Sequence, residues 1–115
     1  MSMREEPGWE PHPLVPGLER KVLLTRAADG APCTLYLFRR QPGGPPAPEA
    51  SPHVHAHSED ITYVLQGSAR LWRADRGEEW LHAGAISRIP AGVSHQVGEF
   101  SEDFFCINVF IPPVE

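Results

Sequence analysis

The sequence predicts an all-β fold, either a sandwich or a barrel. Short apolar segments that are rich in strand-forming residues recur along the chain, and turn residues separate them. No segment has a convincing amphipathic helix pattern. The 115 residues also include 13 prolines and 10 glycines, which break long helices and suit short strands joined by tight turns.

Length and composition predict one domain with a sizeable core. A chain of 115 residues that is 41% hydrophobic can bury one core but is too short for two domains. The net charge of -5, without a basic cluster longer than a pair, argues against binding to nucleic acid or to an anionic membrane. We find no signal peptide and no apolar run of membrane-spanning length, so we expect a cytoplasmic protein.

The N-terminal part of the chain combines an irregular arm with the first strands. Four prolines in residues 1–17 predict a proline-rich arm, followed by a single barrel domain at residues 18–115. We expect Trp9, Leu14 and Val15 of the arm to contact a partner subunit, and we place His12 on the surface. The domain then begins with a strand at 21–25, a turn at 28–31, a buried strand at 33–39 and a loop at 41–52.

The rest of the chain predicts a succession of short strands. Period-two alternation places Thr62 and Val64 on the same face of their strand as Asp60. The last strand is apolar on both faces, which indicates that one face packs on a second sheet or on a second subunit. The expected strands are 61–65, 68–73, 79–82, 86–89, 94–98 and 103–111.

Three histidines at alternate positions precede the central strand. In an extended chain His53, His55 and His57 point to one side, so all three imidazoles could face one cavity. Two acids, Glu59 and Asp60, follow directly. Imidazole and carboxylate together suit a divalent transition metal. The alternative interpretation of this stretch by itself is a solvated polar loop.

Two motifs with glycines at fixed positions are present, of which the first contains this stretch and the second follows it. The first is His53-x-His55, four residues, Asp60, six residues and Gly67. The second is Gly84, five residues, Pro90-x-Gly92, two residues and His95. Together they resemble the two motifs of the cupin family, in the same order and at the same spacings. Asp60 stands in the position of the family's glutamate, and Glu99 stands where the family usually has asparagine.

The resemblance implies a small jelly-roll barrel, the double-stranded β-helix, with a metal inside one end. The metal ligands that it implies are His53, His55, Asp60 and His95. Asp60 is one methylene shorter than glutamate, so the alternative is that it only orients an imidazole, with His57 or Glu59 taking its place. The ion would be divalent iron, manganese, nickel or zinc, with one or two positions left open.

Three functions are compatible with this site. The first is a metal-dependent enzyme that acts on a small organic substrate as an oxygenase, isomerase or cyclase, with His57 or Glu59 as the general acid or base. The second is a non-catalytic sensor or stabilising module that binds a metal or a small ligand. The third is a barrel that holds zinc only for stability. The resemblance also implies a homodimer with an exchanged N-terminal strand, which would cover exposed strand edges.

Overall fold

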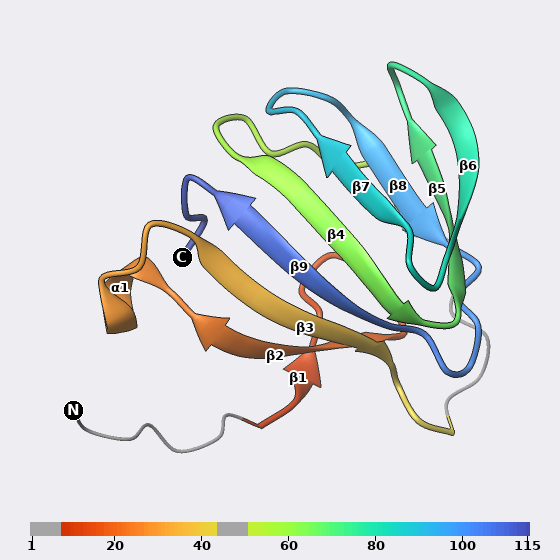
Figure 1. The fold of residues 1–115 in the computed structure, drawn as a ribbon, viewed down its shortest axis with the longest axis horizontal. Helices are drawn as coiled ribbons and strands as arrows, with labels where there is room; N and C mark the ends of the chain where they lie inside the picture. Colours follow the sequence, from red (N-terminus) through yellow and green to blue (C-terminus); the bar gives the residue numbers. More distant parts are fainter. Residues whose placement is uncertain (1–7, 44–50) are drawn as a thin grey trace.

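The computed structural model describes residues 8–43 and 51–115, and they form two antiparallel sheets that face each other (Figure 1). One sheet has six strands in the order β1-β2-β3-β9-β4-β7, and the other has three in the order β6-β5-β8. The strands are β1 Glu10–Pro11, β2 Leu18–Leu24, β3 Thr34–Arg40, β4 Glu59–Gln66, β5 Ser68–Arg73, β6 Gly77–His82, β7 Ile86–Ile89, β8 His95–Gly98 and β9 Phe105–Ile111. The all-β prediction is confirmed.

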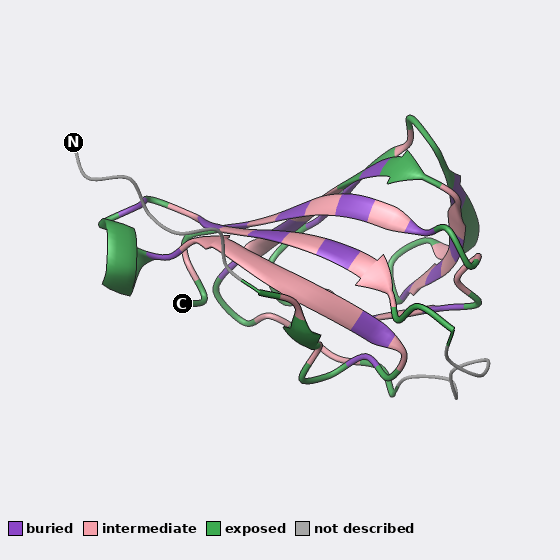
Figure 2. Cartoon of the chain, turned by 90° about the horizontal axis from the view of Figure 1, so that it is seen from below, coloured by how far each residue is buried: buried purple, intermediate pink, exposed green. Residues whose placement is uncertain are grey.

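The core lies between the two sheets. Buried positions alternate with less buried ones along the strands (Figure 2). On β4, Asp60 and Val64 are buried and Thr62 faces the same cavity, as the period-two pattern predicted. On β9 the even-numbered residues Cys106, Asn108 and Phe110 face inward, and the odd-numbered residues face away. The outer face of β9 is therefore apolar without contributing to this core.

The segment between β2 and β3 is a short helix, α1 (Arg26–Asp29), where we expected only a turn. Thr25 caps it, because its side-chain oxygen accepts a hydrogen bond from the backbone N–H of Ala28 at 2.9 Å. Gly30 ends it in the left-handed conformation. Four residues are too few for a helical pattern to be visible in the sequence. No helix in the described part of the chain has the length and apolarity needed to cross a membrane.

The described part of the N-terminal arm packs on its own chain. β1 pairs with β2, and the Arg39 guanidinium carbon lies 4.0 Å from the centre of the Trp9 ring. Val15 belongs to the core and is 2% exposed, so it does not offer a surface to a partner subunit. Leu14, another of the three residues expected at a subunit contact, has an exposed side chain, at 51%. Residues 1–7 of the predicted arm lie outside the described residues.

Gly67, which closes the first motif, occupies a position that only glycine fits. Its φ is 76°, and an added Cβ would lie 2.9 Å from the Cα of Phe104. We predict that Gly67→Ala destabilises the fold by about 2–3 kcal/mol, because it combines left-handed strain with a backbone clash. Thermal or denaturant unfolding measures this loss.

Gly98→Ala is the matched control, since a Cβ at Gly98 meets no atom within 4 Å. Equal stability losses in the two variants would contradict the explanation from local backbone contact.

Candidate metal centre

His53, His55 and His95 come together at one end of the core. One ring nitrogen of each lies within 4.8 Å of the others. The ring centroids of His53 and His95 are 4.3 Å apart, and that of His55 lies 5.2 Å from His53 and 5.4 Å from His95. The first two histidines precede β4, and His95 begins β8 of the other sheet. The structure thus brings together three imidazoles that are up to 42 positions apart in the sequence.

Backbone hydrogen bonds hold the three histidines in place. His53 and His95 form an isolated antiparallel bridge, in which each N–H donates to the other's carbonyl, at 2.8 and 2.9 Å. Gly92 N–H, in the turn before β8, donates to the His55 carbonyl at 2.9 Å. Residues 51–58 do not form a regular strand, but the chain stays extended enough for His53 and His55 to face the same side. The Pro-x-Gly turn of the second motif is therefore hydrogen-bonded to the first motif.

Asp60 lies beside the histidines from the inner face of β4. Its Oδ2 is 3.2 Å from His95 Nε2 and 3.7 Å from His55 Nε2. Its Oδ1 accepts a hydrogen bond from Asn108 Nδ2 at 2.7 Å, and the same amide donates to Thr62 Oγ1 at 2.8 Å. Asp60 and Asn108 are 8% and 2% exposed. Asn108 thus holds the buried carboxylate in one orientation, with the other oxygen toward the imidazoles.

The surroundings of the three histidines and Asp60 shift their pKa values in different directions. Burial, followed by the neighbouring imidazoles His95 and His55, lowers the pKa of His53 to about 4. Burial also lowers the pKa of His55. At His95 burial acts in the same direction, but the Asp60 carboxylate and the Val93 carbonyl outweigh it and raise the pKa. Burial would raise the pKa of Asp60, but hydrogen bonds from His95 and Asn108 lower it, so Asp60 is ionised at neutral pH.

These donor atoms fit a divalent transition metal. His53 Nδ1 and His55 Nε2 are buried and have no hydrogen-bond partner, which is costly for a polar atom unless another group binds it. His95 Nδ1 lies 3.0 Å from the Val93 carbonyl, a contact that keeps a proton on Nδ1. Nε2, which faces Asp60 at 3.2 Å, is therefore the nitrogen that can bind a metal once it has lost its proton. Neutral imidazoles with an adjacent carboxylate match the ligand preference of iron, manganese, nickel and zinc.

The structure does not bring His57 or Glu59 to this centre. His57 is exposed in the bend before β4, and neither residue lines the cavity. Glu59 begins β4 on its outer face, where Arg88 holds its carboxylate through two bonds of 2.7 and 2.8 Å. Strand alternation explains the difference, because only Asp60 of the two adjacent acids can point inward.

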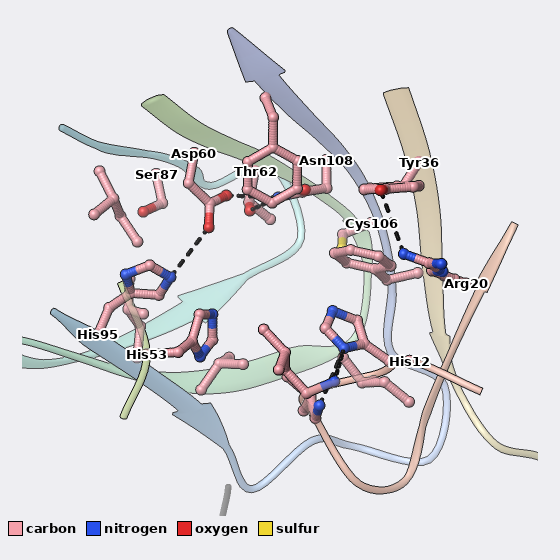
Figure 3. Close-up of a pocket in the computed structure, with 18 of the residues that line it drawn as sticks. His12, Arg20, Tyr36, His53, Asp60, Thr62, Ser87, His95, Cys106 and Asn108 are labelled. Carbon is pink, nitrogen blue, oxygen red and sulfur yellow. Dashed lines mark hydrogen bonds and ion pairs between the residues drawn. The ribbon is translucent and has the colours of Figure 1, made fainter. Parts of the chain in front are cut away.

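A cavity of about 260 Å³ opens beside the three histidines (Figure 3). Its walls are largely apolar, with Phe38, Leu71 and Phe110 among them.

His12 also lines this cavity, although we expected this residue on the surface. Burial, then Arg20 and His53, lower the pKa of His12 to about 4, and its Nδ1 accepts the N–H groups of Leu14 and Val15, both at 3.0 Å. His12 is therefore neutral. Its flanking prolines gave no sign that it turns inward.

A family model for the cupin domain matches residues 36–110. The chain belongs to the cupin family. The match covers both motifs, the strands β4 to β8 and most of β3 and β9, so the expectation raised by the motif spacing is confirmed. No curated protein matches this cupin.

Solved structures share the fold. KdgF from Halomonas sp. is 21% identical with a TM-score of 0.70, over 91% of this chain and 87% of that one. An RmlC-like cupin from Shewanella frigidimarina is 23% identical with a TM-score of 0.70, over 99% and 91%. A predicted oxalate decarboxylase from Thermotoga maritima is 21% identical with a TM-score of 0.72, over 97% and 99%. At these identities the likeness establishes the jelly-roll fold alone. The two sheets of this chain stay separate among the described residues, without a hydrogen-bonded closure.

We predict that, in the metal-free protein, His95 titrates at higher pH than His53 and His55. Burial opposes charge on all three rings, but at His95 the bond to Asp60 outweighs it. Charged His95 therefore stabilises the metal-free fold below its ordinary pKa, and this contribution is lost as the pH rises through its folded-state pKa. NMR titration of the imidazole protons measures the order, and Asp60→Asn should lower the pKa of His95. Protonation of His53 before His95 on acidification would contradict the assignment.

Proposed function

We propose that this cupin binds one divalent transition metal through His53, His55 and His95 and acts as a metal-dependent enzyme on a small organic molecule. The observation that carries the proposal is the convergence of three imidazoles, each with a buried ring nitrogen that has no hydrogen-bond partner, at the end of an apolar cavity. A structural zinc site would be closed by four protein ligands. Here a cavity adjoins the histidines, which leaves room for a substrate.

The residues around the histidines support chemistry as well as binding. When bound, a divalent ion of this kind would polarise a carbonyl or hydroxyl oxygen of the substrate or, if redox-active, would take part in oxidation. Asp60 is an ionised, buried carboxylate held by Asn108, so it can keep an imidazole oriented and offer a negative charge to a bound cation. The largely apolar walls lower the local dielectric constant, which strengthens polar interactions in the site. These features favour an oxygenase, isomerase or cyclase over a passive site.

We predict that the metal-free protein takes up one equivalent of Fe(II), Mn(II), Ni(II) or Zn(II). His53→Ala and His95→Ala should each reduce the affinity by more than the roughly 10–100-fold loss typical of removing an outer hydrogen-bond partner. The loss of metal affinity in Asp60→Asn should stay within that range if Asp60 only orients an imidazole. The loss should exceed that range if Asp60 is a ligand. Calorimetric titration and elemental analysis of untagged protein measure these affinities.

His82→Ala serves as the control, because His82 is exposed at the end of β6 and does not line the cavity. Wild-type protein that takes up none of these ions would refute the metal proposal.

The second candidate function is a non-catalytic module that binds a small ligand, since the same cavity would also hold a ligand without converting it. The two functions differ in one observable. An enzyme loaded with metal converts its substrate, and the conversion disappears in His53→Ala. A module binds a small molecule and returns it unchanged.

We further propose that the outer face of the six-stranded sheet is a homodimer interface. Strand alternation leaves large apolar side chains exposed there, including Ile86 at 69%, Tyr63 at 44% and Leu65 at 43%. The adjacent charges of Arg88–Glu59 and Arg39–Glu19 are already paired within the chain. Two copies of an acidic protein can therefore approach at this face without bringing unpaired like charges together. A second copy presenting the same face gives a two-fold symmetric contact.

We predict that Ile86→Glu converts the dimer to a monomer, because it places two unpaired carboxylates in a desolvated apolar contact. Sedimentation velocity at micromolar concentration measures the change. Trp80→Glu is the matched control, since Trp80 is 51% exposed on β6 of the other sheet. A monomeric wild-type protein at that concentration would rule out this interface.

A further inference from the structure

The cavity has a second polar end, away from the histidines. Arg20 of β2 and Tyr36 of β3 lie together there, on the side opposite His53 and His95 (Figure 3). Both side chains belong to the inner face of the six-stranded sheet. Apolar side chains form the wall between the two ends. A ligand that fills the cavity would therefore meet an apolar surface along its length and polar groups at both ends.

Arg20 and Tyr36 form a fixed pair of hydrogen-bond donors. The Arg20 side chain is 17% exposed and Tyr36 is 3% exposed. Arg20 Nη1 donates to the Tyr36 hydroxyl oxygen at 3.3 Å, and its guanidinium carbon lies 5.1 Å from the centre of the Tyr36 ring. Arg20 Nε donates to Glu10 Oε1 at 2.8 Å, which also holds the guanidinium in place. A half-buried guanidinium next to a buried phenol is a good site for a carboxylate.

The Glu115 side chain occupies this site in the structure. Its carboxylate accepts a hydrogen bond from the Tyr36 hydroxyl and lies 3.4 Å from Arg20 Nη2. The Glu115 side chain is 40% exposed, so the carboxylate reaches the buried donors from the surface. Charge-assisted hydrogen bonds are usually shorter than 3.4 Å, so the contact with Arg20 is weak.

The backbone of Glu115 is held independently of its side chain. The buried Thr34 Oγ1 accepts the Glu115 N–H and donates to the Glu115 carbonyl, both at 3.0 Å. The Arg26 N–H donates to the same carbonyl at 2.8 Å. The carboxylate can therefore leave Arg20 and Tyr36 by rotation of the side chain, while the chain segment stays docked.

We propose that Arg20 and Tyr36 form a carboxylate subsite of the cavity and that the Glu115 side chain fills it when no ligand is bound. The ligand class is a small carboxylic acid with an apolar body. Its carboxylate displaces that of Glu115, and an oxygen at its other end lies near His53, His55 and His95. The position of that second oxygen rests on the proposed metal function, whereas the carboxylate subsite does not. Glu115 adds a second carboxylate to the guanidinium that Glu10 already pairs, and it competes with the ligand for Arg20 and Tyr36.

Benzoate is a suitable probe, because it combines a carboxylate with a compact apolar ring, and benzamide is its neutral counterpart. We expect metal-free protein to bind benzoate and to bind benzamide at least about tenfold more weakly, since the amide lacks the charge that Arg20 recognises. Glu115→Gln should strengthen benzoate binding by about tenfold, because it removes the internal competitor's charge. Arg20→Gln should weaken it by at least about tenfold. Calorimetry or NMR titration measures the affinities.

Arg88→Gln is the control for loss of one positive charge, because Arg88 lies on the outer face and pairs with Glu59. Unchanged or weaker benzoate binding by Glu115→Gln overturns the subsite, as does wild-type affinity in Arg20→Gln. Glu115→Gln alters a partly exposed side chain, so the test remains decisive if Arg20→Gln does not fold, which thermal unfolding reveals. Titration with Fe(II), Mn(II), Ni(II) and Zn(II) separates the two proposals. Benzoate binding without uptake of any of these ions refutes the metal function alone, and metal uptake without benzoate binding refutes the subsite alone.

Discussion

The two backbone hydrogen bonds between His53 and His95 are the contact on which the site depends. They join the irregular segment before β4, which belongs to the large sheet, to the first residue of β8 in the small sheet. Without this bridge the histidines of the first motif would sit on an unpaired loop. With it, the imidazoles of this segment and the imidazole of His95 face the same space.

Side chains alternate between the two faces of the large sheet, and those on the inner face supply the polar groups of the cavity. Inward residues of β4 and β9 supply Asp60 and Asn108, whose hydrogen bond keeps a buried charge satisfied within an otherwise apolar wall. Inward residues of β2 and β3 supply Arg20 and Tyr36 at the other end. The same alternation turns the opposite residues outward as an apolar face. One periodicity therefore underlies the core, both polar ends of the cavity and the proposed dimer surface.

Sequence reasoning found the histidines but mistook some of their neighbours. The motif spacing identified His53, His55 and His95 as a group, because short motifs before a strand and after a tight turn keep their local geometry. Glu59 was misplaced because strand alternation, which starts at this residue, sends it to Arg88 on the outer face. His12 was missed because its inward position depends on Leu14 and Val15, whose backbone N–H groups it accepts. Asn108 carried a weak signal, as the one amide in an apolar strand.

By itself the sequence determined the all-β class, the family, the inward face of β4 and the histidines that belong together. These properties follow from period-two patterning and from short-range spacing, which the chain carries locally. Tertiary structure alone decided which face of β9 turns inward and which distant residues share the cavity. Arg20, Tyr36 and Glu115 are separated by up to 95 positions, and only the pairing of β2 with β3 and the docking of the final residues on Thr34 bring them together. No local pattern encodes such contacts, because they arise from how the sheets fold over each other.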